Sequence, residues 1–385
     1  MHETTRLLRD LVAIPGINPM GRDLRGEQVY EHRVTAYLEQ FFRSLGVPCR
    51  RQSIAPQRDN VVARSESPGS RRTLVFEAHQ DTVPTDHMTI DPFGATIENG
   101  RLYGRGACDI KGGMASMLHA FARLVRERPA GSARVVMACT VDEEHTFLGV
   151  QELVKGDLRG GVNGPIFAVA AEPTNLNIVH AHKGAVRWHL TTTGRSCHSS
   201  RPERGINAVY HMAALLGLIE RYASELWTTK MHALLGPATI SVGRIEGGTS
   251  VNTVPEHCRI EIDRRVLPGE APDEMPRQLE DFLKRHAPGH IAFQSSAPFL
   301  SCPALSPDGS EALRERLGEA IDAVVGKHVV EPVPYGTDAS TLAEAGIPSV
   351  VFGPGDIAQA HTCDEWVSLD EVEKAGEILF RLACG

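Results

Sequence analysis

The sequence predicts an α/β protein whose first domain is discontinuous, with a smaller α+β domain inserted into it. Short apolar runs alternate with amphipathic helical stretches over the first 180 residues and again near the C-terminus. This alternation is typical of a mostly parallel sheet flanked by helices. Between about residues 180 and 293 the order changes to β-α-β-β-α-β, that of a ferredoxin-like sandwich. The 385 residues are too many for one ordinary domain and suit two.

Hydrophobic periodicity predicts the elements of the first domain, residues 1–179 and 294–385. Apolar residues at helical spacing predict helices, and short apolar runs predict buried strands. The expected helices are 4–14, 27–45, 113–126 and 310–325, and the expected strands are 74–78, 134–141, 166–171 and 349–352. The segment 64–72, rich in Ser, Gly and Pro, predicts an exposed turn between strands.

The inserted domain, residues 180–293, has its own order of elements. The expected strands are 186–193, 238–245, 258–266 and about 290–294, and the expected helices are 206–222 and 272–286. The first of these strands alternates apolar and polar residues, as a half-exposed strand does. Because the insert interrupts the first domain, that domain is discontinuous in sequence.

Composition and charge exclude several classes of protein. Hydrophobic residues make up 42% and charged residues 23% of the chain, the balance of a soluble globular protein. The formal net charge of −8, without a basic patch, argues against nucleic-acid binding. No stretch is long and apolar enough to span a membrane, and the first residues contain no apolar signal core. The eight cysteines are scattered without a Cys-x-x-Cys pair, which is typical of reduced thiols, so we expect a cytoplasmic protein.

Histidine and acidic residues follow the ends of predicted strands at several points. They are His79 and Asp81, Asp109 in the glycine-rich loop Gly104–Gly113, the pair Glu143 and Glu144, and Glu172. Alone, each has an ordinary explanation, such as a helix cap or a solvated surface. Because ligands bind beyond the carboxyl ends of parallel strands, we expect these side chains at one edge of the sheet. Crowded carboxylates repel one another unless a cation neutralises them, so the sequence predicts a metal site.

The types of ligand indicate which metal is bound. Histidine and carboxylates without thiolate suit Zn²⁺, with Co²⁺ or Mn²⁺ as substitutes. His79 offers a ring nitrogen, and Asp81 can accept from the other ring N–H and fix the tautomer. Two metals about 3.5–4 Å apart need a bridging carboxylate, for which Asp109 is the candidate. His361, in the loop after the last predicted strand, offers a second histidine.

Several short motifs, taken in order, resemble one enzyme family. They are His79-Gln80-Asp81-Thr82-Val83-Pro84, Gly104–Gly113, Asp142-Glu143-Glu144, Ala171-Glu172-Pro173-Thr174 and Cys197-His198-Ser199-Ser200-Arg201-Pro202. Their order and spacing resemble the zinc-dependent acetylornithine deacetylase, succinyl-diaminopimelate desuccinylase and glutamate carboxypeptidase family. The resemblance extends from Leu11 to His361.

This resemblance implies a metal-ligand set. His79, Asp109 and Glu172 would hold one zinc ion, and Asp109, Glu144 and His361 would hold the other. Asp109 would therefore be shared. A glutamate at position 172 resembles the deacylase and carboxypeptidase branch of the family rather than the peptidases that release N-terminal residues.

The resemblance also implies catalytic residues. Glu143, beside a ligand but not itself one, would be the general base, and Asp81 would orient His79. His198, in the insert, would stabilise the oxyanion of the tetrahedral intermediate, in its own site or in that of a partner subunit. The insert would then serve as a lid and dimerisation domain of a homodimer, attached to a catalytic di-zinc domain.

Substrate contacts are expected at four positions. Arg265 resembles the arginine of the family that binds the substrate carboxylate, although Arg264 beside it leaves the register open. Asn252 resembles a polar contact to the substrate. Thr337 lies in a loop that resembles the one receiving the substrate's backbone end, and Gly355 precedes His361 in the last loop.

We therefore expect a two-zinc hydrolase that cleaves the amide bond of an N-acyl amino acid, as an acetylornithine deacetylase does. A succinyl-diaminopimelate desuccinylase, or a carboxypeptidase or dipeptidase acting on a dipeptide, is the alternative within the family. Outside it, a two-metal phosphoesterase would use similar ligands, but no additional phosphate clamp is evident. An inactive sensor of an amino-acid derivative is disfavoured because none of the expected ligands, nor the base, is replaced.

Overall fold

The chain folds into two compact units. A computed structural model describes residues 1–65, 67, 69–156, 158 and 164–385. Unit 1 comprises Met1–Ala181, Ser306–Pro332 and Thr337–Gly385, and unit 2 comprises His182–Leu305 and Val333–Gly336. Unit 2 extends beyond residue 293 because strand β17 (Leu300–Cys302) pairs with its sheet. Of the expected turn 64–72, residues 66 and 68 lie outside the described residues.

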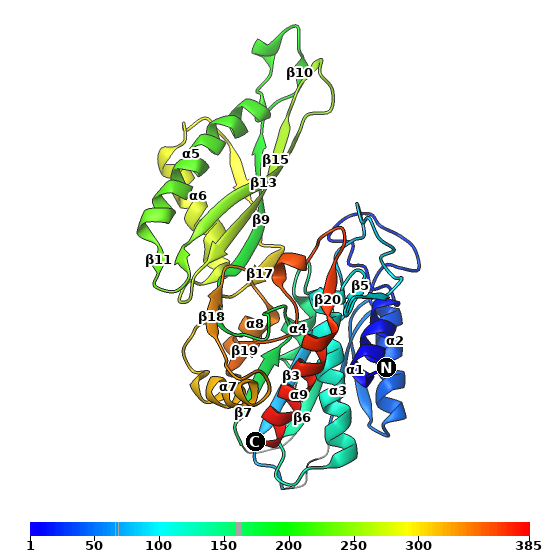
Figure 1. Ribbon diagram of the computed structural model, residues 1–385. Helices are drawn as coiled ribbons and strands as arrows, with labels where there is room; N and C mark the ends of the chain where they lie inside the picture. Colours follow the sequence, from blue (N-terminus) through cyan, green and yellow to red (C-terminus); the bar gives the residue numbers. More distant parts are fainter. Residues whose placement is uncertain (66, 68, 157, 159–163) are drawn as a thin grey trace. The chain divides into compact units, whose positions relative to one another are not determined.

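An eight-stranded sheet forms the middle of unit 1 (Figure 1). Its order is β1 (Cys49–Ala55), β2 (Arg58–Arg64), β6 (Arg134–Thr140), β3 (Thr73–His79), β7 (Ile166–Ala170), β19 (Ser349–Val351), β8 (Ile178–His182) and β18 (Val330–Val333). The central strands β6, β3, β7 and β19 run parallel, whereas β1, β2 and β8 are antiparallel to their inner neighbours. The expected parallel sheet is thus confirmed in its centre, and the outer strands make the whole sheet mixed.

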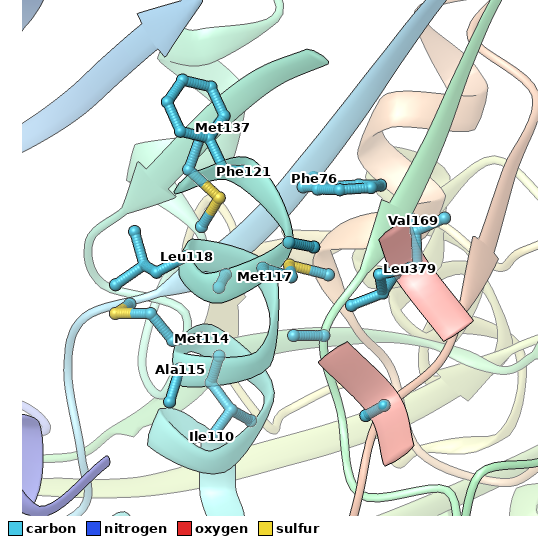
Figure 2. Close-up of a cluster of buried hydrophobic side chains, with 14 of the residues drawn as sticks. Phe76, Ile110, Met114, Ala115, Met117, Leu118, Phe121, Met137, Val169 and Leu379 are labelled. Carbon is cyan, nitrogen blue, oxygen red and sulfur yellow. The ribbon is translucent and has the colours of Figure 1, made fainter. Parts of the chain in front are cut away.

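Helices cover this sheet and bury its apolar side chains. They are α1 (Glu3–Val12), α2 (His32–Ser44), α3 (Gly112–Glu127), α4 (Leu148–Leu153), α7 (Glu311–Val325), α8 (Asp338–Glu344) and α9 (Leu369–Cys384). Met117 and Phe121 of α3 lie in one core with Phe76 of β3 and Leu379 of α9 (Figure 2). Every residue of α3 from Gly112 to Ala122 is buried, so this helix lies inside the core, between the sheet and helices α1 and α9.

Unit 2 is an antiparallel sheet covered by two helices. The sheet order is β13 (Thr239–Gly247), β15 (His257–Val266), β9 (Gly184–Thr193) and β16 (Phe293–Ser295). Along the chain the elements run β9, α5 (Ala208–Thr229), β13, β15, α6 (Met275–His286) and β16 (Figure 1). This order confirms the ferredoxin-like topology. Trp188, Ile260 and Leu279 are buried in the core of this unit.

Short strand pairs complete the two units. In unit 2, β10 (Cys197–His198) pairs with β14 (Thr253–Val254), and β11 (Met231–His232) pairs with β12 (Gly236–Pro237). In unit 1, β20 (Trp366–Ser368), β5 (Arg101–Tyr103) and β4 (Thr96–Glu98) form a small sheet. Because β5 leads into the glycine-rich loop and β20 follows His361, this sheet ties those two loops together. Within the described part of the chain, no helix has the length and apolar character needed to cross a membrane.

Candidate metal centre

The central strands bring the expected ligands to one edge of the sheet. His79 is the last residue of β3, Glu143 and Glu144 follow β6, and Glu172 follows β7. His361 lies in the loop after β19. Because these four strands are parallel, their carboxyl ends share one edge, and the side chains meet there.

Asp109 lies between the two histidines of this cluster. Its Oδ1 is 3.3 Å from Nε2 of His79, and its Oδ2 is 3.2 Å from Nε2 of His361. Nε2 of His361 is also 3.2 Å from Oε2 of Glu144, and Nε2 of His79 is 4.0 Å from Oε1 of Glu172. Each histidine is therefore accompanied by Asp109 and by one glutamate.

Glycines allow the loop that carries Asp109 to approach the cluster closely. Gly106 has a φ of 80°, a region that favours glycine, and a Cβ there would lie 2.6 Å from Cγ2 of Thr82. The peptide bond between Asp109 and Ile110 is cis. The glycine-rich sequence of this loop is thus required by the short distance between its backbone and the loop after β3.

The donor atoms of this cluster fit a bound cation. His79, Asp109 and Glu144 offer ligand atoms within 4.8 Å of one another, and so do His79, Glu143 and Glu172. Nε2 of His79 and Oε1 of Glu144 are buried without an aligned hydrogen bond, which leaves both atoms available to a metal. Glu143 groups with His79 as the other carboxylates do, so distance alone gives it no separate role.

The electrostatics of the cluster also favour a cation. Burial raises the pKa of Glu143 well above its usual range, and Glu172 raises it further. Burial and the neighbouring Asp109 act in the same way on the pKa of Glu172. Hydrogen bonds to Asp109 and Glu144 raise the pKa of His361 to about 11. The carboxylates therefore attract positive charge strongly at this point, which makes the cluster suitable for a divalent cation.

Asp81 connects the end of β3 to the loop after β6. Nδ1 of His79 lies 3.0 Å from the backbone oxygen of Asp81 and 3.6 Å from its Oδ1. Because a carbonyl oxygen only accepts, Nδ1 carries the proton and Nε2 is free to bind a metal. The Asp81 carboxylate accepts from the backbone N–H groups of Glu143 at 3.3 Å and Glu144 at 3.2 Å.

Two buried polar groups beside the cluster were not expected from the sequence. Nδ2 of Asn18 donates to Asp81 at 2.8 Å and to Asp142 at 2.9 Å. Glu365, which is fully buried, pairs with Arg105, whose Nη1 is 2.7 Å from Oε2. Arg105 stands between two glycines of the glycine-rich loop, where a buried cation requires an acidic partner, but the sequence does not indicate which acidic residue that is.

His198 and Asn252 lie together in unit 2. His198 pairs with Thr253 across β10 and β14, and the backbone N–H of Ser199 donates to the backbone oxygen of Asn252 at 2.9 Å. Nδ1 of His198 is 3.2 Å from the backbone nitrogen of Ser200, whose N–H it accepts. Both His198 and Asn252 are exposed.

The structure separates the neighbouring arginines of β15. Arg264 is only 1% exposed and pairs with Glu270 at 3.0 Å, so it belongs to the interior of unit 2. Successive side chains of a strand point to opposite faces, which places Arg265 on the other face. There Nε of Arg265 is 2.8 Å from Oδ1 of Asp263, and the Arg265 side chain is 30% exposed. Of the two arginines, Arg265 is therefore the accessible one.

Thr337 and Gly355 have structural contacts of their own. Thr337 caps α8, since its Oγ1 accepts the backbone N–H of Ala339 at 3.2 Å. The backbone N–H of Gly355 donates to Oε2 of Glu371 at 2.7 Å, and a Cβ at Gly355 would lie 2.6 Å from Sγ of Cys108. A role for either residue in substrate binding stays a prediction.

Similar proteins identify the family. The model of peptidase family M20/M25/M40 matches residues 75–384. An acetylornithine deacetylase of Myxococcus xanthus is 32% identical over 326 residues, which cover 84% of this chain and 82% of that protein.

Two solved structures share the fold. An M20 family metallo-carboxypeptidase from Sulfolobus solfataricus has a TM-score of 0.79 at 20% identity, covering 100% of this chain and 99% of that chain. A dinuclear metal-binding peptidase of the M20 family from Bacillus subtilis has a TM-score of 0.67 at 18% identity, covering 99% and 96%. The resemblance found in the motifs is thereby confirmed over most of the chain. The chain belongs to peptidase family M20/M25/M40 and is a metal-dependent hydrolase.

Proposed function

We propose that this chain is a two-zinc deacylase that hydrolyses the amide bond of N-acyl amino acids. The observation that carries the proposal is the position of Asp109, whose two carboxylate oxygens face His79 and His361 separately. A carboxylate in that position can bridge two metal ions. The similarity to the Myxococcus xanthus acetylornithine deacetylase supports the class of substrate.

The residues present fit a pair of zinc ions. His79, Asp109 and Glu172 would hold one ion, and Asp109, Glu144 and His361 would hold the other. Nitrogen and oxygen ligands without thiolate suit Zn²⁺, and Co²⁺ or Mn²⁺ can replace it. When bound, the metal pair lowers the pKa of a water molecule and polarises the carbonyl group of the amide.

Glu143 would move the proton during the reaction. As general base it takes a proton from the attacking water, and as general acid it delivers that proton to the leaving nitrogen. Burial and the nearby Glu172 raise the pKa of Glu143 in the metal-free site, and bound metal would lower it toward the range in which a carboxylate can first take up a proton and then deliver it. Asp81 supports this role because it accepts the backbone N–H of Glu143.

His198 and Arg265 would contact the substrate from unit 2. Since Nδ1 of His198 accepts the N–H of Ser200, its proton lies on Nε2, which can donate to the developing oxyanion. Arg265 would bind the substrate carboxylate through two parallel N–H groups. Asn252, in the loop beside His198, would supply a further polar contact.

A homodimer formed through unit 2 is part of the proposal. Strand β13 is at the edge of its sheet, and an exposed edge strand can pair with a second copy. Tyr210, Ala213, Ala214 and Gly217 form an exposed, uncharged stripe on the adjacent helix α5. Ile245 on β13 is 52% exposed. An apolar helix stripe beside an open strand edge favours a two-fold contact between identical surfaces.

Hydrolysis of a substrate panel tests the proposed activity. N-acetyl, N-formyl and N-succinyl amino acids and dipeptides are assayed with Zn²⁺ and with a chelator, and the released amino acid is measured. We expect chelator-sensitive hydrolysis that is fastest with an N-acetyl amino acid. Preference for succinyl compounds would point to a desuccinylase, and preference for dipeptides to a peptidase. No turnover of any compound by protein with two bound zinc ions would reject the proposal.

A further inference from the structure

The side chain of Glu365 accepts hydrogen bonds from the loop that carries Asp109. Oε1 of Glu365 accepts from the backbone N–H groups of Cys108 at 2.9 Å and Asp109 at 3.0 Å. Oε2 accepts from the backbone N–H of Gly106 at 3.0 Å and from Nη1 of Arg105 at 2.7 Å. All four donors therefore come from residues 105–109 and converge on one fully buried carboxylate.

A carboxylate suits this position better than any neutral side chain. An ionised carboxylate only accepts hydrogen bonds, and both of its oxygens here face donors. Asp109 departs from helical geometry, with φ −113° and ψ 92°, so the chain does not form regular helical hydrogen bonds here. The backbone N–H of Asp109 therefore needs another acceptor. Arg105 is 2% exposed, and its buried charge needs an anionic partner.

Glu365 also connects the two loops that meet at the metal centre. It stands four residues after His361, and its backbone oxygen accepts the N–H of Gly104 at 3.0 Å. The loops touch again where Sγ of Cys108 donates to the backbone oxygen of Asp356 at 3.3 Å. A shift of Glu365 would therefore displace Asp109 relative to His361.

We propose that Glu365 is a positioning residue of the metal centre. Its carboxylate fixes the backbone at Asp109 so that one oxygen of Asp109 faces His79 and the other faces His361. Glu365 does not bind the metal itself. The inference rests on the proposed metal pair, and it assigns part of the affinity for that pair to a residue outside the ligand set.

Substitution of Glu365 by glutamine tests this role. Glu365→Gln keeps the size of the side chain but turns an NH₂ group toward two donors, so two of the four hydrogen bonds are lost. We expect the apparent affinity for Zn²⁺, measured by competition with a chelating indicator, to fall about 10- to 100-fold. The absorption spectrum of the Co²⁺-substituted protein should also change, because it reports the arrangement of the ligands.

Glu270→Gln is the matched control. Glu270 also accepts from a largely buried arginine, Arg264, at 3.0 Å, and from a backbone N–H, that of Leu267, at 2.9 Å, but it lies in unit 2. This variant should lower Tm while leaving metal affinity and the Co²⁺ spectrum unchanged. Glu365→Asp keeps the charge with a shorter reach, and its metal affinity should lie between those of wild type and Glu365→Gln. It replaces Glu365→Gln if that variant does not fold.

The outcomes separate this inference from the proposed function. If Glu365→Gln shows wild-type metal affinity and an unchanged Co²⁺ spectrum, with only a lowered Tm, Glu365 is structural and the inference is wrong. If the wild-type protein itself binds no metal pair, the proposed function fails instead. Loss of metal affinity in Glu270→Gln as well as in Glu365→Gln would also overturn the inference, because any buried glutamate would then have that effect.

Discussion

Nη1 of Arg58 donates to Oδ1 of Asp142 at 2.7 Å, directly before the two glutamates of the metal centre. Nε of the same guanidinium donates to Glu31 at 2.9 Å, and Glu31 is fully buried. Asn18 joins Asp142 to Asp81. Next to the metal centre, Arg58 is thus part of a buried network in which it pairs with two carboxylates, those of Glu31 and Asp142.

Removal of this cation should be strongly destabilising. Burial raises the pKa of Glu31 to about 7 although Arg58 lowers it, whereas Glu31 and Asp142 raise the pKa of Arg58 against the effect of burial, so desolvation and attraction oppose each other in the intact pair. In Arg58→Met, however, Glu31 and Asp142 lose their buried partner, and we expect a loss of about 3–5 kcal/mol in the free energy of unfolding. Urea denaturation of the metal-free protein measures it.

Arg51→Met is the control for this prediction. Arg51 pairs with Glu39 at 2.7 Å, but its side chain is 42% exposed. Solvent screens such a pair, so the expected loss is at most about 1 kcal/mol. Equal losses of unfolding free energy in the two variants would show that the buried network stabilises the fold no more than an exposed ion pair does.

Glu143→Ala should separate the general base from the metal ligands. The variant should keep about two zinc ions per chain while kcat falls about 10²- to 10⁴-fold, because proton transfer is lost but the ligand set is intact. Metal analysis and steady-state kinetics on the same preparation measure both quantities. Glu144→Ala should instead lose metal. If Glu143→Ala lost metal and Glu144→Ala retained it, the two roles would have to be exchanged.

His198→Ala should lose rate without losing metal. Removing a donor to the oxyanion lowers kcat about 10²- to 10³-fold in other hydrolases, and the proposed ligands all lie in unit 1. His257→Ala, which removes an exposed histidine of unit 2, is the comparison and should keep normal kinetics. Normal turnover in His198→Ala would remove this residue from the mechanism.

The sequence predicted helices and strands that contain a clear apolar periodicity or apolar run of their own. Helix α3 was expected from the helical spacing of Met114, Met117, Leu118 and Leu124, and strand β3 from the short apolar run that begins at Leu74; both elements are buried in the structure. Strand β1 was not expected, because its Cys49-Arg50-Arg51-Gln52 sequence has no apolar run and it becomes a strand by pairing with β2. Helix α9 was also missing from the expected elements, although Val372, Ile378 and Leu379 are buried at helical spacing.

Some residues of the candidate site could likewise be predicted from the sequence, and others could not. His79, Glu144 and Glu172 follow strand ends, so their proximity follows from the parallel order of the strands. Glu365 could not be inferred in this manner, because its four donors come from residues 105–109, far away in the sequence. Supporting contacts of this kind arise only when distant loops fold together, and no local pattern encodes them.

A charge on the open edge of β13 should prevent dimer formation. In Ile245→Lys the new ammonium group would be placed against a second copy, and edge lysines are known to block strand pairing. Sedimentation velocity should show a dimer for the wild type and a monomer for the variant. Ile97→Lys, at a 41% exposed isoleucine of unit 1, should remain dimeric. A dimer in both variants would place the interface elsewhere, and a monomeric wild type would reject the homodimer.

Stability should fall in mild acid because of His182. This side chain is fully buried, its Nδ1 lies 2.9 Å from the backbone oxygen of Lys183, and burial lowers its pKa to about 4. The folded state therefore holds the neutral ring, whereas the unfolded chain binds a proton at the ordinary pKa of 6.5. The stabilisation is fully present above about pH 7 and is lost as the pH falls from about 6.5 to about 4.

The size of this effect can be isolated with His182→Asn, whose side-chain amide can still donate to the same carbonyl oxygen. Urea denaturation of metal-free wild type and variant at pH 7.5 and pH 4.5 gives four free energies of unfolding. Groups common to both proteins cancel in the comparison, so the wild type should lose up to about 3 kcal/mol more than the variant. Equal losses in the two proteins would mean that His182 is protonated in the folded state, which its burial opposes.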